Sequence, residues 1–123
     1  MTTRNWILTV AIVFPACAAQ PLPAPDASPI HGIVQAARAD AAKRSGLAPM
    51  QLQLVLAEVV TWPNGSLGCP RPCMLYTDAL VPGYRVKLKV GNQLWDYHAS
   101  ERGGGPVLCP PGQSQEPGPG GRD

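Results

Sequence analysis

Residues 84–99 have the sequence Y-R-V-K-L-K-V-G-N-Q-L-W-D-Y-H-A, which contains the most regular alternation in the chain. Up to position 90, apolar and basic side chains alternate strictly, which is typical of a half-buried strand. Gly91-Asn92 is a two-residue hairpin signal, so residues 93–99 are expected to return as the partner strand. The stretch therefore predicts an antiparallel hairpin with two unlike faces. The expected inward side chains are Tyr84, Val86, Leu88 and Val90, and the expected outward ones are Arg85, Lys87 and Lys89.

Two further strands are predicted on either side of this hairpin. Residues 51–61 (Q-L-Q-L-V-L-A-E-V-V-T) alternate at first, which predicts an earlier strand with Leu52, Leu54 and Leu56 on one side. Three glycines at positions 103–105 predict another reversal, and residues 106–109 then form a short last strand. The sequence thus predicts a three- or four-stranded antiparallel sheet.

One helix is predicted before the sheet. Ser28 suits the N-cap, Pro29 suits the first helical position, and Gly46 suits the left-handed position after the helix. The expected fold is α+β, with one N-terminal helix packed on the small antiparallel sheet. Because so small a core contributes only a few kcal/mol, we expect a disulfide to staple it. The narrow apolar stripe of the helix consists of Ile30, Ile33, Val34, Ala37 and Ala41.

The first residues predict export. Arg4 precedes an uncharged apolar run at positions 6–14, which is too short for the roughly 20 residues that span a bilayer. We interpret residues 1–16 as a signal peptide. Ala16 and Ala18 form an A-x-A cleavage site that would release a soluble secreted form. Alternatively, Cys17 becomes the lipidated first residue of a lipoprotein, at the start of a proline-rich tether over residues 17–28. The tether favours a membrane-anchored lipoprotein in the periplasm or at the cell surface.

Composition limits the remaining possibilities. Pro 15 and Gly 13 exceed ordinary usage, and they are dense in residues 110–123, which we predict to be a disordered tail after a domain at 29–109. The net charge of +2, spread along the chain, argues against a nucleic-acid partner. Four cysteines in a short exported chain indicate an oxidising compartment.

The segment between the first two predicted strands carries a recognisable motif. Residues 62–76 have the sequence W-P-N-G-S-L-G-C-P-R-P-C-M-L-Y, and T-D-A-L-V-P-G-Y follows. Over residues 37–109 the chain resembles small exported bacterial proteins of unassigned function that share a W-P-D-G-S-L-G-C-P-x-P-G motif. Here Asn64 replaces the usual aspartate and Cys73 the usual glycine. The resemblance implies a disulfide between Cys69 and Cys109, which leaves Cys73 as the odd thiol.

The same segment permits a sharper chemical interpretation. Cys69, Cys73, Met74 and His98 offer thiolate, thioether and imidazole groups, which suit Cu(I). One structural disulfide with a spare thiol explains these residues more simply. His98 is expected to be half buried, and no serine, carboxylate pair or second histidine stands with it to make a triad or an acid/base couple. We therefore predict no enzyme, no catalytic residue, no cofactor and no metal. The basic stripe on residues 85–89 is expected to be a solvated face.

Two functional hypotheses remain open. The first is a non-catalytic binding or structural domain of the cell envelope, attached to the membrane through a lipid anchor and possibly to an envelope protein partner. The second is a small peptidase inhibitor that presents residues 62–76, because a stiff, stapled loop binds with little ordering cost. The candidate interaction residues are Trp62, Asn64, Arg71, Cys73 and Tyr76.

Overall fold

The sheet has four antiparallel strands in chain order. The computed structural model describes residues 28–118, so the predicted signal peptide, most of the tether and Cys17 lie outside the described residues. The order across the sheet is β1-β2-β3-β4. Val90 pairs with Gln93 across a turn in which Gly91 has φ +60°, which confirms the predicted hairpin. The strands are β1 Gln53–Trp62, β2 Val81–Val90, β3 Gln93–Ser100 and β4 Val107–Cys109.

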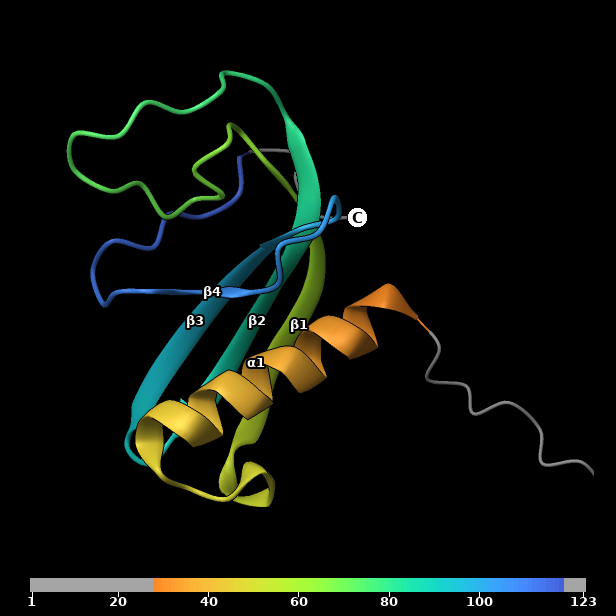
Figure 1. Ribbon diagram of the computed structural model, residues 1–123, viewed down its shortest axis with the longest axis vertical. Helices are drawn as coiled ribbons and strands as arrows, with labels where there is room; N and C mark the ends of the chain where they lie inside the picture. The colour runs from red at the N-terminus through yellow and green to blue at the C-terminus, as the bar shows by residue number, and fades with distance from the viewer. Residues whose placement is uncertain (1–27, 119–123) are drawn as a thin grey trace, which may run out of the picture.

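One helix, α1 (Pro29–Ser45), crosses one face of this sheet (Figure 1). Pro29 opens it, and Gly46 ends it in the left-handed conformation with its N–H donated to Ala42. Ser28 stands at the N-cap position, although its side chain makes no capping bond. A 3₁₀ turn, η1 (Pro49–Gln51), leads into β1. The predicted α+β class, with one helix on a disulfide-stapled antiparallel sheet, is confirmed. The core between helix and sheet consists of Val34, Ala37, Ala41, Leu52, Val86, Leu88, Val90 and Tyr97.

The predicted face of β1 is wrong beyond its first residues. The register shifts between Leu54 and Leu56, so Leu54 lies opposite Leu88 while Leu56 lies opposite Lys87 on the other face. Leu52 is buried, but Leu54 is 43 % exposed. A β-bulge inserts one residue and reverses which side chains face the core after it. The apolar and polar alternation of residues 51–61 does not show where that extra residue lies, so the sequence could not predict the reversal.

The face of the sheet opposite α1 is also covered, so the prediction of a solvated basic stripe is wrong. Arg85 was expected on a solvated basic stripe, but it is 2 % exposed. Lys89 is exposed and Lys87 is half buried, so the stripe does not form a uniform solvated face. The cover comes from the chain between β1 and β2 and from the chain after β4, which run side by side in Figure 1.

Residues 110–118 are packed against the domain, and the prediction of a disordered tail is wrong for them. The backbone N–H of Gln115 donates to the carbonyl of Gly68, and Pro117 is buried. The Oε2 atom of Glu116 lies 2.6 Å from Nη1 of Arg85. Composition argued against burial because proline and glycine contribute little apolar area. The segment docks through polar contacts instead, and residues 119–123 lie outside the described part.

Candidate functional site

The chain between β1 and β2, which we call the 63–80 loop, has a firmly held base. The Asn64 side chain accepts a hydrogen bond from the backbone of Ser66, and Gly65 N–H donates to the carbonyl of Thr77. Cys69 and Cys109 form a disulfide with Cα atoms 5.6 Å apart, as the resemblance implied. Two ends of the loop and the last strand are thereby joined into one unit.

The outer half of the 63–80 loop is exposed. Residues 71–80 are exposed throughout except for Tyr76, which is half buried. Leu75 is 100 % exposed, Leu80 69 % and Met74 56 %. A pocket of about 200 Å³ lies between this part of the loop and the sheet, with Met74 and Val107 among its walls. The loop thus carries apolar side chains into solvent on a fixed base.

A tight turn forms the tip around Cys73. The backbone N–H of Met74 lies 3.4 Å from the carbonyl oxygen of Arg71, and Cys73 has φ +62°. Pro72 is the second residue of this four-residue turn, and Cys73, with its positive φ, is the third. This pattern is typical of a type II turn, in which glycine is preferred at the third position. The Oη atom of Tyr76 accepts a hydrogen bond from the backbone of Arg71 at 2.9 Å, which closes residues 71–76 on themselves. The Cys73 thiol is free and exposed.

We expect Cys73→Gly to raise the free energy of unfolding by about 1 kcal/mol, because glycine adopts positive φ without the steric cost of a Cβ. Cys73→Ala keeps the Cβ and serves as the matched control, so it should give no comparable gain. Urea unfolding of the three proteins under non-reducing conditions measures the difference. Equal stability of the Gly and Ala variants would contradict the strained turn.

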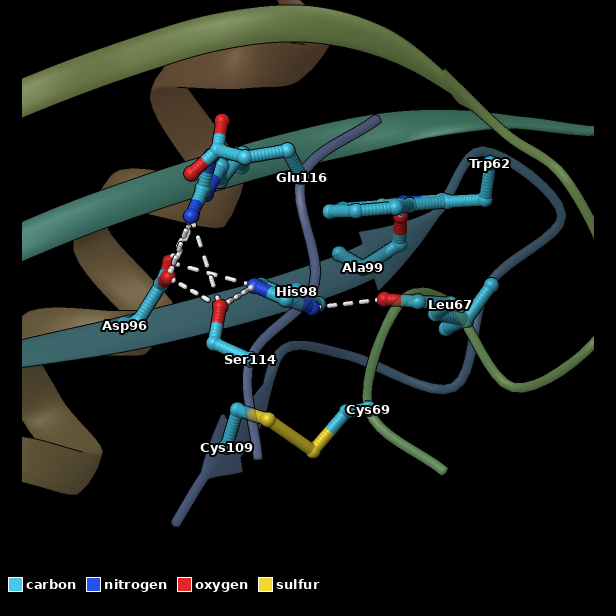
Figure 2. A network of polar contacts seen from close by, with 10 residues as sticks. Trp62, Leu67, Cys69, Asp96, His98, Ala99, Cys109, Ser114 and Glu116 are labelled. Carbon is cyan, nitrogen blue, oxygen red and sulfur yellow. Dashed lines mark hydrogen bonds and ion pairs between the residues drawn. A yellow bond between two sulfur atoms is a disulfide. The ribbon is translucent and has the colours of Figure 1, made fainter. Parts of the chain in front are cut away.

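Behind the 63–80 loop lies a cluster of charged and polar side chains that we call the buried polar cluster (Figure 2). Nε of Arg85 lies 3.1 Å from Oδ1 of Asp96, and Nη2 lies 2.7 Å from Oδ2. The Oγ atom of Ser114 donates to Oδ2 of Asp96 at 2.6 Å. The cluster consists of Arg85, Asp96, His98, Ser114 and Glu116.

His98 is fully buried at the centre of the cluster, not half buried as predicted. Its ring stacks on the indole of Trp62 with centroids 4.3 Å apart. Nδ1 donates to the carbonyl of Leu67, and Nε2 lies 3.2 Å from Oδ1 of Asp96. The indole N–H of Trp62 donates to the carbonyl of Ala99. Both aromatic residues therefore anchor the 63–80 loop to β3.

The electrostatics of the cluster stabilise the charged pair. Burial opposes ionisation of Asp96, but hydrogen bonds from His98, Arg85 and Ser114 outweigh it and hold its pKa well below the usual range. Burial likewise opposes the charge on Arg85. Hydrogen bonds to Asp96 and Glu116, together with their negative charge, raise its pKa above the ordinary value. Arg85 and Asp96 are therefore both charged in the folded protein near neutral pH.

Asp96, His98 and Ser114 are the residue types of a hydrolase triad, but their geometry differs from one. A triad places the acid on one ring nitrogen and the nucleophile on the other. Here Asp96 and Ser114 both lie at Nε2, while Nδ1 is bonded to a backbone carbonyl. The Ser114 proton is directed to Asp96. The arrangement holds chain segments together and offers no activated nucleophile at Ser114.

The structure separates the residues predicted for the interaction loop. Arg71 and Cys73 are exposed at the turn, whereas Trp62 is fully buried and Asn64 and Tyr76 are half buried with structural bonds. The proposed copper ligands do not form a set, because Cys69 is in the disulfide. Among residues 28–118, no group of three or more His, Cys, Asp and Glu side chains is arranged to hold a metal ion.

Sequence reasoning missed the buried polar cluster, although part of it was visible. Asp96 and His98 are two apart on one strand and must share a face, and Arg85 lies directly opposite His98 in the register. The predicted hairpin therefore already placed Arg85 on the same face as Asp96 and His98, where an ion pair between Arg85 and Asp96 could form. Ser114 and Glu116 carried no such signal.

Comparison with known proteins identifies the domain but assigns it no activity. A family model described as "Domain of unknown function (DUF8738)" matches residues 34–109, more than half of the chain. No curated protein and no solved structure matches the chain. In the part of the chain that the structure describes, no helix is long and apolar enough to cross a membrane.

Proposed function

The chain belongs to the family described as Domain of unknown function (DUF8738), and we propose that it is an exported protein of the cell envelope that binds a protein partner without catalysing a reaction. The outer half of the 63–80 loop is its binding surface. A lipid on Cys17 and the proline-rich tether hold the domain at the membrane, in the periplasm or at the cell surface.

One observation carries the binding role. Leu75 is fully exposed, with Met74 and Leu80 also largely exposed, at the tip of a loop whose base is held by a disulfide and backbone hydrogen bonds. Covering exposed apolar side chains with a partner lowers the free energy of the system, which favours binding. A loop already held in one conformation loses little entropy on binding, which leaves more of that gain as affinity.

Export is supported by different observations. Disulfides persist in oxidising compartments, and the Cys69–Cys109 bridge is buried in the fold. The sequence of residues 1–16 has the charged, apolar and small-residue regions of a signal peptide. Cys17 follows them directly and is the first residue of the tether. Fractionation of cells that make the wild type or Cys17→Ser tests the anchor: the wild type should be found with the membranes and the variant in the soluble fraction.

The binding surface is tested with two equally exposed apolar positions. Met50 is 95 % exposed and lies in η1, outside the 63–80 loop, so it is the matched control for Leu75. We expect a photo-crosslinker placed at position 75 in the native envelope to capture one discrete partner, and one at position 50 to capture none. Leu75→Asp should reduce recovery of that partner at least tenfold without changing the melting temperature, and Met50→Asp should not.

The outcome also distinguishes the two hypotheses. A protease as the captured species, inhibited by the purified domain, would replace the non-catalytic envelope role with the inhibitor role. Equal capture at positions 50 and 75 would show that the 63–80 loop is not the binding surface.

A further inference from the structure

The segment after β4 is held in the way a receptor holds a bound peptide. Three consecutive residues each contact the body of the domain: the Ser114 hydroxyl bonds to Asp96, the Gln115 backbone to Gly68, and the Glu116 carboxylate to Arg85. Pro117, the next residue, is buried. Side-chain contacts thus alternate with a backbone contact along an extended stretch, and a small apolar residue is covered at its end.

Asp96 of β3 holds the Arg85 guanidinium from within the sheet, and Nη2 of Arg85 also donates a longer hydrogen bond, 3.3 Å, to Oγ of Ser114 in this segment. Two nitrogens of the guanidinium, Nε and Nη2, are bonded to Asp96, which fixes the plane of the group. Nη1 is directed to Glu116 at 2.6 Å. The Arg85 side chain is 3 % exposed, whereas that of Glu116 is 61 % exposed. One partner belongs to the interior of the sheet, and the other comes to it from the surface.

The segment can also leave without disturbing the sheet. It follows Cys109 after a short turn in which Gln113 N–H donates to the carbonyl of Pro110, and it contributes no strand. If the segment left, Nη1 of Arg85 would lose its acceptor, Glu116, and Oδ2 of Asp96 would lose the hydroxyl that donates to it. Such a pair of groups is complementary to an extended peptide that offers a hydroxyl and, two residues later, a carboxylate.

We propose that Arg85 and Asp96 form a binding site for an extended acidic peptide, and that residues 114–117 of the same chain occupy this site as an internal ligand. The site lies behind the loop and is separate from the exposed surface assigned above, so the two proposals stand or fall independently. An internal ligand competes at an effective concentration on the order of millimolar, so an external peptide enters when the internal contacts are weakened.

The test opens the site in the full chain. The double variant Ser114→Ala/Glu116→Ala removes the Ser114 hydroxyl and the Glu116 carboxylate, which bond the internal segment to the site, and leaves Arg85 and Asp96 in place. The probe is a labelled peptide with the sequence of residues 113–118, Q-S-Q-E-P-G. We expect it to bind the double variant at least tenfold more tightly than the wild type, by fluorescence anisotropy. Gln113→Ala, a change on an exposed side chain of the same segment, is the control and should behave as the wild type.

A second peptide tests the chemistry of the site. With the glutamate of the probe replaced by glutamine, binding to the double variant should weaken about tenfold or more, because a charge-assisted hydrogen bond is lost. Failure of the probe to bind the folded double variant at millimolar concentration, or equal binding of both peptides, would overturn the proposal. Mixing the double variant with unlabelled wild type and measuring mass by sedimentation tests one source of the peptide: a mixed dimer would show that the segment of a second copy can occupy the open site.

If the double variant does not fold, the wild type itself provides the measurement. Hydrogen exchange of the backbone amides of residues 114–116 should accelerate at least threefold when the probe is present at several millimolar, while the amides of β2 and β3 do not change. Unchanged exchange at residues 114–116 under these conditions would equally overturn the proposal.

Discussion

Replacing Asp96 with Ala should lower the free energy of unfolding by about 3–5 kcal/mol, because it leaves the buried guanidinium of Arg85 without its main counter-charge. Nε of Arg85 loses its acceptor and Nη2 loses the shorter of its two hydrogen bonds, while the Ser114 hydroxyl also loses its acceptor. Asp78, an exposed carboxylate on the 63–80 loop, is the matched control. Asp78→Ala should change stability by less than about 0.5 kcal/mol. Urea unfolding at pH 7 measures both.

The pH dependence provides an independent check of the same pair. The folded-state pKa of Asp96 lies below its unfolded value, so the stabilisation is fully present above about pH 4. As the pH falls further, the unfolded state takes up the proton first and the stabilisation is lost. The stability difference between the wild type and Asp96→Asn should therefore shrink steadily as the pH falls from 4 towards 2. A difference that stays constant over this range would mean that Asp96 is not stabilised as an anion.

Loss of the Cys69–Cys109 bridge should lower the free energy of unfolding by about 4 kcal/mol. The bridge joins residues 40 apart, and the chain-entropy relation for a loop of that length gives this value. Removal of a native disulfide from a small secreted domain often abolishes folding at 37 °C, so the double variant Cys69→Ser/Cys109→Ser is expected to be largely unfolded at that temperature. Changing both residues avoids a new thiol that would pair with Cys73.

The control for the bridge is Cys73→Ala, which keeps the disulfide and should keep wild-type resistance to urea within about 1 kcal/mol. Circular dichroism of each variant with increasing urea, without reductant, gives the comparison. Peptide mapping of the unreduced wild type identifies the pairing directly. A peptide in which Cys73 is linked to Cys69 or Cys109 would show that the bridge forms differently in the mature protein.

Local patterns were sufficient for much of the fold. The alternation of residues 84–90 and the Gly91-Asn92 turn predicted β2, β3 and their register, because both signals depend on neighbours within a few positions. Pro29 and Gly46 predicted the two ends of α1 for the same reason. The bulge in β1 escaped prediction, since it depends on how β1 is matched to β2 and not on the order of its own side chains.

By itself, the sequence determined the hairpin and the helix with its ends, because their causes are local backbone preference and side-chain period. Tertiary structure alone decided that Arg85 is buried and not solvated, and that residues 110–118 are docked and not free. Both outcomes require groups from β2, β3 and the C-terminal segment to meet on the second face of the sheet. The guanidinium of Arg85 can be buried there because Asp96 and Glu116 neutralise its charge. The C-terminal segment buries little apolar area, and it docks because Glu116 forms an ion pair with that guanidinium.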